Sequence, residues 1–169
     1  ALDYFVLWVN AETPYKTDKA YLDAVKKEPG KFMMGGTGSA QEDQIITIML
    51  EQAFGLKLLY VPFKGGGDVA VQLVGKHVNS TVNNPAEAVS HWKAGRLRPL
   101  ATIDSARISL PEWDTIPTLK ESAGTDLSYL MLRGLFGAPG ITKEQQAFYA
   151  DVLKKVTETP EWKKYISDN

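Results

Sequence analysis

Between residues 31 and 39 the chain reads Lys-Phe-Met-Met-Gly-Gly-Thr-Gly-Ser, an apolar strand pattern that runs directly into glycines and hydroxyl residues. Five apolar residues then follow at helical spacing, and Gly55 closes that helix: Ile45, Ile46, Met49, Leu50 and Ala53. A strand, a glycine turn and an amphipathic helix make up the unit from which parallel sheets are built. The pattern therefore predicts an α/β protein with a turn, Gly35–Ser39, at the carboxyl end of a strand.

The same alternation continues on both sides of this unit. Further strands are predicted at residues 2–9, 56–63, 77–82 and 98–103, and further helices at 18–27, 69–74 and 86–93. Thr17 is the expected cap of the first helix, and Pro85 lies at the start of the last. This spacing favours a mostly parallel sheet with helices on both faces.

The C-terminal part has a different pattern. Leu127–Gly137 is apolar and contains two glycines, as expected for a strand that crosses close to another backbone. Thr142 opens a long helix with Gln145 in a capping-box position, and Thr159-Pro160 starts a last helix that is predicted to stop at Asn169.

Composition excludes several classes of function. A chain of 169 residues is too short for a large multidomain enzyme, and its net charge of -1 gives no general field for nucleic acid. The absence of cysteine removes disulfides, thiolate chemistry and cysteine-based metal sites. No apolar run reaches the roughly 20 residues of a membrane span, so no direct membrane insertion is expected. Because the chain begins in a strand pattern without Met, we interpret it as a fragment or a processed product.

Three predicted strand-to-helix turns carry the unusual residues of this sequence: Gly35–Asp43, Lys64–Asp68 and Asn83–Glu87. In a parallel sheet such turns meet at one edge, where open α/β sheets bind ligands. Each turn also presents a helix N-terminus, which favours a small anion, and glycine lets the anion approach the backbone. A carboxylate is the ligand that this arrangement favours.

Each turn also has a purely structural interpretation. The Gly35–Ser39 turn needs its Thr or Ser only as a helix cap, Lys64–Gly67 is equally consistent with a flexible turn, and Asn83 and Asn84 suit a cap. The spacing of a P-loop and the full dinucleotide fingerprint are both absent. His77 and His91 have no partner for catalysis. We therefore predict no catalytic residue, no metal site and no cofactor.

Four separated segments together resemble one known family, the Bug-type extracytoplasmic solute receptors of tripartite tricarboxylate transporters. The segments are Phe32–Ser39, Tyr60–Gly65, Trp92–Ala101 and Ile116–Gly124. The resemblance spans nearly all of the chain. It implies a two-lobed periplasmic binding protein of type II that clamps a small carboxylate and delivers it to a membrane transporter.

The resemblance also assigns positions to the site and the lobes. It implies ligand contacts at Gly36, Thr37, Gly38, Ser39, Asn83 and Asn84, and the chemistry of the second turn adds Lys64 and Gly65 to the predicted site. Residues 1–126 are expected to form the second lobe, and residues 127–169 the return toward a first lobe that would precede Ala1. The sequence departs from the family in having Asn83 where an acid is common and Met34 where a small hydroxyl residue is common.

The leading hypothesis is a periplasmic receptor whose partners are a small carboxylate and the subunits of a membrane transporter, with self-association of the fragment. The alternatives are a fragment of an anion- or phosphate-using α/β enzyme and the effector lobe of a transcription regulator. No helix-turn-helix or basic face supports the regulator.

Overall fold

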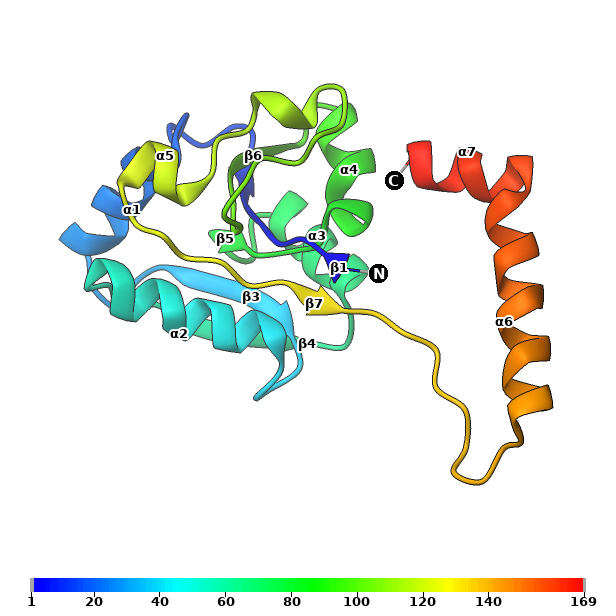
Figure 1. The fold of residues 1–169 in the computed structure, drawn as a ribbon. Helices are drawn as coiled ribbons and strands as arrows, with labels where there is room; N and C mark the ends of the chain where they lie inside the picture. Colours follow the sequence, from blue (N-terminus) through cyan, green and yellow to red (C-terminus); the bar gives the residue numbers. More distant parts are fainter. Residues whose placement is uncertain (1, 169) are drawn as a thin grey trace. The chain divides into compact units, whose positions relative to one another are not determined.

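A five-stranded sheet forms the centre of residues 2–132 in the computed structural model, which describes residues 2–168 (Figure 1). In the order β4-β3-β5-β2-β6, the strands are Leu59–Phe63, Met33–Thr37, Ser80–Thr81, Val6–Asn10 and Leu97–Thr102. β3 pairs in parallel with β4 and β5, whereas β2 pairs antiparallel with β5 and β6. Four of the five strands therefore run in one direction, which confirms the predicted mostly parallel sheet, with β2 as the reversed strand.

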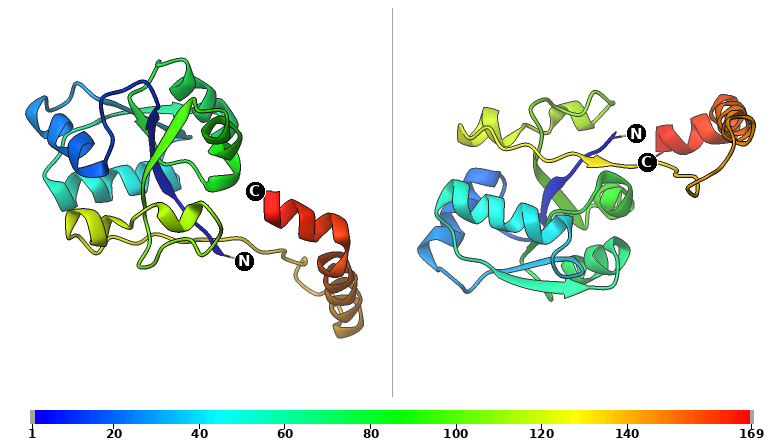
Figure 2. Two further views of the ribbon diagram at one scale, coloured as in Figure 1. Left: turned by 90° about the horizontal axis from the view of Figure 1, so that it is seen from above. Right: turned by 60° about the horizontal axis from the view of Figure 1, so that its bottom comes forward.

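Helices cover both faces of this sheet (Figure 2). One apolar cluster joins α1 (Asp18–Lys27), α2 (Glu42–Phe54) and α5 (Leu119–Ala123) to the sheet. A second cluster joins α3 (Gly66–Val74), α4 (Pro85–Lys93) and the 3-10 helix η1 (Trp113–Thr115). Side chains along β2 alternate between the two clusters. Leu7 and Val9 belong to the first cluster, Val6 and Trp8 belong to the second, and all four are buried.

Local chemistry sets most helix boundaries as predicted. The Thr17 side chain accepts a hydrogen bond from the N–H of Ala20 and caps α1. Gly55 ends α2 with φ +64°, a left-handed conformation that favours glycine. Pro85 is the first residue of α4, where its missing N–H costs no helical hydrogen bond.

The predicted Gly35–Ser39 turn is partly wrong, because Gly35, Gly36 and Thr37 belong to β3. Packing explains why glycines occur inside this strand. A Cβ on Gly35 would lie 3.1 Å from Val78, and a Cβ on Gly36 would overlap Tyr60 and Asp43. The glycines therefore allow neighbouring side chains to pack closely against the strand, in addition to their role in the turn.

Other boundaries were displaced by tertiary contacts. α3 begins at Gly66 rather than at Val69, and β5 is reduced to two residues. The buried face of α2 is rotated from the predicted one: Asp43, Ile46, Thr47 and Leu50 are buried, whereas Ile45 is 40% exposed. The acid Asp43 thus lies on the buried face of α2, which the spacing of apolar residues had predicted to be formed by apolar side chains alone.

The predicted strand at residues 2–9 is two strands. β1 (Leu2–Asp3) pairs with β7 (Met131–Leu132), and β2 joins the main sheet. The apolar segment 127–137 is therefore a strand only over two residues, although Tyr129 also donates its N–H to the carbonyl of Ile103. Figure 1 shows this segment, in yellow, running along the sheet to β7.

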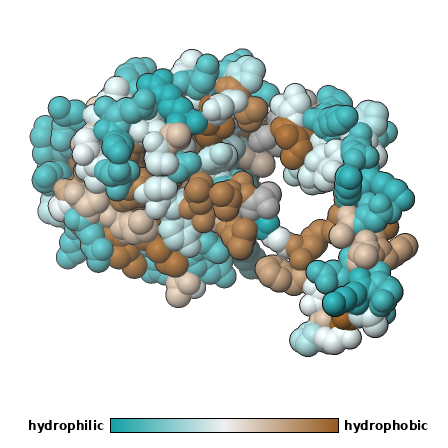
Figure 3. Space-filling model, in the orientation of Figure 1, coloured by the Kyte–Doolittle hydropathy of each residue, from teal (hydrophilic) through white to brown (hydrophobic). Residues whose placement is uncertain are grey.

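Residues 133–168 form a second unit with two helices, α6 (Lys143–Glu158) and α7 (Pro160–Asp168). The capping box of Thr142 and Gln145 is present as predicted. The predicted end at Asn169 lies outside the described residues. Eight large apolar side chains of these helices are at least 39% exposed within residues 2–168: Phe148, Tyr149, Val152, Leu153, Val156, Trp162, Tyr165 and Ile166. Exposed apolar residues appear as brown patches on both parts of the chain in Figure 3.

Over residues 2–168, each helix is too short or too polar to cross a bilayer.

Candidate functional site

The carboxyl ends of β3, β4 and β5 lie at one edge of the sheet, because these strands are parallel neighbours. The three turns singled out by the sequence follow these strands and lead into α2, α3 and α4. Open α/β sheets bind their ligands at such an edge. The geometry of each turn decides which groups remain available to a ligand.

Most backbone donors of the β3–α2 turn are already used within the protein. The N–H of Thr37 donates to Asp43 Oδ2 at 2.6 Å, and the N–H of Gly38 donates to the carbonyl of Phe63 at 2.9 Å. The N–H of Ala40 donates to the Gln44 side chain. By contrast, the N–H and the hydroxyl of the exposed Ser39 form no hydrogen bond within residues 2–168. Ser39 is therefore a residue of this turn whose donors are free for a ligand.

Two side chains hold this turn from different elements. The Tyr60 hydroxyl on β4 donates to the carbonyl of Gly38 at 2.9 Å and lies 3.2 Å from that of Thr37. Asp43, only 7% exposed, holds the N–H of Thr37 from the first turn of α2. Burial, together with the charge of Glu87, raises the pKa of Asp43 to about 6, although the Thr37 hydrogen bonds lower it. Burial, with the nearby Asp43, raises the pKa of Tyr60 to about 12, so Tyr60 stays a donor at neutral pH.

The β5–α4 turn uses its two asparagines within the protein. The Asn83 amide donates to the carbonyl of Gly66 at 2.8 Å and to Glu87 Oε2 at 3.0 Å. Asn84 is the N-cap of α4 in a capping box with Glu87, and its amide donates to the carbonyl of Tyr4 at 2.6 Å. The cap interpretation therefore describes Asn84. Asn83 is fully buried, and its Oδ1 atom has no partner within residues 2–168.

The β4–α3 turn differs because a carboxylate of the protein itself lies beside it. The Glu87 carboxylate packs so closely against Gly66 that a Cβ there would overlap it. Gly65, the N-cap of α3, has open space around it and an extended backbone that any residue adopts. Lys64 is exposed and forms no ion pair within the described part of the chain. Lys64 thus brings an uncompensated positive charge to this turn.

Sequence reasoning identified the turns but missed three side chains that connect them, Asp43, Tyr60 and Glu87. From the sequence, Asp43 and Glu87 were placed only as the last residues of two turns. The glutamate three residues after Asn84 was an available signal for a capping box. Tyr60 gave no signal, because its contacts with Thr37 and Gly38 join residues that are distant in the sequence.

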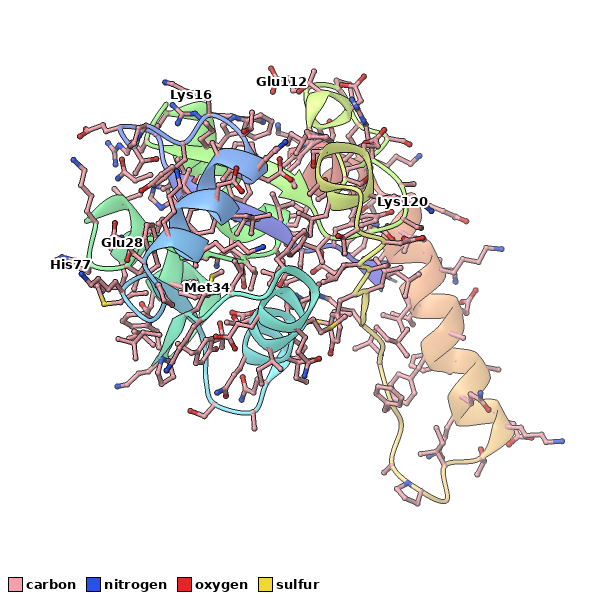
Figure 4. The ribbon with its side chains drawn as sticks, turned by 90° about the vertical axis from the view of Figure 1, so that its left-hand side faces the viewer. Lys16, Glu28, Met34, His77, Glu112 and Lys120 are labelled. Carbon is pink, nitrogen blue, oxygen red and sulfur yellow. The ribbon has the colours of Figure 1, made fainter. Side chains whose placement is uncertain are left out.

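A separate cavity of about 510 Å³ lies away from these turns. It is lined by residues that include Lys16, Asp18, Trp92 and Arg98, near the carboxyl end of β2 and the start of β6. The Arg98 guanidinium is occupied by the carbonyls of Ala11, Thr13 and Tyr15. Figure 4 shows Lys16 at the outer surface and Met34 of β3 in the interior. This cavity contains none of the predicted site residues.

Among residues 2–168, His, Asp and Glu side chains form no group of three that could hold a metal ion.

The fold and the strand-to-helix turns at one sheet edge define a lobe of the type II periplasmic binding proteins. A solved structure described as that of a periplasmic transporter matches 99% of this chain and 55% of its own, with a TM-score of 0.90 and 25% identity. MatC from Rhodopseudomonas palustris with bound malate has a TM-score of 0.89 and 17% identity, covering 99% of this chain and 56% of its own. The same organism's Rpa4515 with adipate has a TM-score of 0.87 and 18% identity, covering 96% of this chain and 54% of its own.

The family model of the tripartite tricarboxylate transporter family receptor matches residues 2–169, and the chain belongs to this family. A protein of Cupriavidus necator, named a UPF0065 protein in the gbd 5' region, is 29% identical over 96% of this chain and 49% of its own length. BugT of Bordetella pertussis is 25% identical over 69% of this chain and 35% of its own. The chain spans about half the length of the first of these relatives and less of the second. A receptor family favours the solute-binding hypothesis over the enzyme fragment and the regulator.

Proposed function

We propose that this chain forms the ligand-binding lobe of a periplasmic receptor that captures a small carboxylate and delivers it to the membrane subunits of a tripartite tricarboxylate transporter. The observation that carries the proposal is the pair of uncommitted donors on Ser39, three residues before α2 begins. Membership of the receptor family supports it, as do the malate and adipate bound to MatC and Rpa4515.

A carboxylate at this turn is stabilised in two ways. One oxygen accepts hydrogen bonds from the Ser39 N–H and hydroxyl, and the positive end of the 13-residue helix α2 adds a favourable field. The backbones of Thr37 and Gly38 shape the turn. Gly36 has no side chain, so Tyr60 and Asp43 can come close enough to hold the turn by hydrogen bonds. Hydrogen bonds to an ionised acceptor are the strong class, which suits a site that recognises a small anion.

The remaining predicted residues set the polarity around the ligand. Lys64 supplies a cation for a second carboxylate, and Gly65 lets the ligand approach the start of α3. Asn83 and Asn84 lie buried beneath the site beside Glu87, and they contribute to it by holding this turn.

The division into lobes is part of the proposal. Residues 1–126 belong to the second lobe, and residues 127–169 lead toward a first lobe, which completes the clamp around the ligand. The coverage of about half of the Cupriavidus necator relative supports this division. The exposed apolar side chains of α6 and α7 support it as well, because such surfaces are normally covered by a partner surface.

Calorimetry on the intact receptor tests the proposed site. Wild-type protein is titrated with malate, adipate and a panel of mono-, di- and aromatic dicarboxylates, and compared with Ser39→Glu. Like charge at Ser39 should weaken binding by more than about a hundredfold, with the fold retained. The matched control is Ser109→Glu, a serine that is also exposed but lies in the loop after β6. Unchanged affinity in Ser39→Glu would overturn the assignment.

A further inference from the structure

The backbone that presents Ser39 is held by two side chains that the family match does not assign to any role. Tyr60 binds the carbonyls of Thr37 and Gly38, and Asp43 binds the N–H of Thr37. The two side chains come from β4 and α2, so the turn is held from both the sheet and the helix. Their hydrogen bonds involve the backbone N–H and carbonyl of Thr37 and the carbonyl of Gly38, which directly precedes Ser39.

The turn requires such support because its conformation is unusual. Gly38 has φ +58°, and Ala40, which is not a glycine, has φ +57°. Residues with a Cβ rarely adopt this left-handed region unless surrounding contacts fix it. Gly36 is pressed between Tyr60 and Asp43, where a Cβ would overlap both. The two hydrogen bonds from Tyr60 and the hydrogen bond to Asp43 together fix where the Ser39 donors lie.

The hydrogen bond from the Thr37 N–H needs only an oxygen acceptor at position 43, and does not require an acid. An asparagine oxygen would accept from the Thr37 N–H without burying a charge. Asp43 is nearly buried and meets like charges rather than a cation: Glu87 acts on it from α4 and Glu42 from its own helix, while Tyr60 faces it from β4. Its carboxylate is therefore poorly compensated, although it lies only four residues after Ser39 in the sequence and accepts a hydrogen bond from the N–H of Thr37.

We propose that Tyr60 and Asp43 are positioning residues of the carboxylate site, and that Asp43 takes up a proton from water when a carboxylate binds at Ser39. The proposal rests on the proposed function. Hydrogen bonds from Tyr60 and to Asp43 keep the Ser39 donors pointing toward the ligand. The added negative charge of the ligand disfavours the ionised form of Asp43, so the proton offsets the repulsion between the two carboxyl groups.

The sign of the pH dependence follows from linkage. Free Asp43 has a pKa of about 6, raised chiefly by burial, and a bound anion raises it further. The bound state then holds more protons than the free state near neutral pH, so affinity rises as pH falls. For a further rise of about one pKa unit, affinity should be about fivefold higher at about pH 6 than at about pH 8.

The test uses calorimetry on the intact receptor with the tightest-binding carboxylate of the panel above. Titrations at about pH 7 in two buffers of different ionisation enthalpy measure proton uptake on wild-type protein, without any variant. Tyr60→Phe should bind about three- to tenfold more weakly at every pH, because it loses the hydrogen bonds to the turn. Asp43→Asn should bind without the fivefold pH dependence. Tyr129→Phe and Asp18→Asn are the matched controls, a tyrosine in the core cluster and a buried acid bound to Ser122.

The outcomes separate the two proposals. If wild-type protein binds no carboxylate of the panel at any pH, the proposed function fails and this inference fails with it. If wild-type protein binds a carboxylate without proton uptake, and Tyr60→Phe and Asp43→Asn keep its affinity and pH profile, the proposed function stands and this inference is overturned. Proton uptake together with a pH-independent Asp43→Asn variant supports it.

Discussion

Residues 2–132 and residues 133–168 bury their apolar side chains to very different extents. In the first unit, Phe5 to Val9 are completely buried between two helical layers. In the second, α6 has no buried residue, although its sequence is as amphipathic as that of a core helix. The difference teaches that helix formation and core formation are separate requirements. Capping and helical spacing suffice for α6, whereas the first unit also has partner surfaces within its own chain.

Matched tryptophan substitutions should give the largest difference in stability between the two units. Trp8 is fully buried, contacts Trp92 and Trp113, and donates to the carbonyl of Asn83, so Trp8→Ala should lower the free energy of unfolding by about 3–5 kcal/mol. Trp162 on α7 is 39% exposed, and Trp162→Ala should cost less than about 1 kcal/mol. Urea denaturation of the 169-residue chain measures both. Equal losses would show that the two units are equally packed.

The buried acid of the first unit should give the next largest effect. Because the pKa of Asp43 in the folded state is about 6, above its ordinary value, the folded chain binds more protons than the unfolded chain between about pH 4 and 6. Stability from this group is therefore lost as pH rises through that window, by up to about 3 kcal/mol. Asp43→Asn should remove this slope, as measured by urea denaturation at several pH values. A variant with the wild-type slope would show that Asp43 is not the group responsible.

The exposed face of the second unit should give a smaller effect, on association rather than folding. We expect the 169-residue chain to self-associate in sedimentation analysis and to bind carboxylates weakly, because the proposed lobe by itself would leave the ligand in contact with water. The double change Phe148→Glu and Val152→Glu, on exposed apolar positions of α6, should shift the protein toward monomer. Lys154→Glu on the same helix is the control. A monodisperse wild-type monomer with micromolar dicarboxylate affinity would contradict this prediction.

Local signals predicted much of the fold, because they act within a few residues. Thr17, Gly55, Pro85 and the Thr142 capping box each determine a helix end through their own backbone neighbours. Features that depend on distant residues were not predicted. β3 continues through Gly35 and Gly36 because Val78, Phe63, Tyr60 and Asp43 pack against them.

The candidate site divides in the same way. The turn containing Ser39 was predicted because glycine and hydroxyl residues between a strand and a helix have a local meaning. The hydrogen bonds that use up the donors of Thr37, Gly38 and Ala40 were not, so the sequence did not single out Ser39 among its neighbours. Glu87 likewise acts across the sheet edge, on Asp43 and against Gly66.

The most direct test of the proposed site is the backbone amide of Ser39. In a titration of the intact receptor with malate or adipate, followed by amide chemical shifts in nuclear magnetic resonance, the Ser39 N–H should show one of the largest changes. The amides of Lys16 and Asp18, beside the cavity of about 510 Å³, should stay unchanged. Large shifts at Lys16 and Asp18 with none at Ser39 would place the ligand in that cavity and contradict the carboxylate site at the β3–α2 turn.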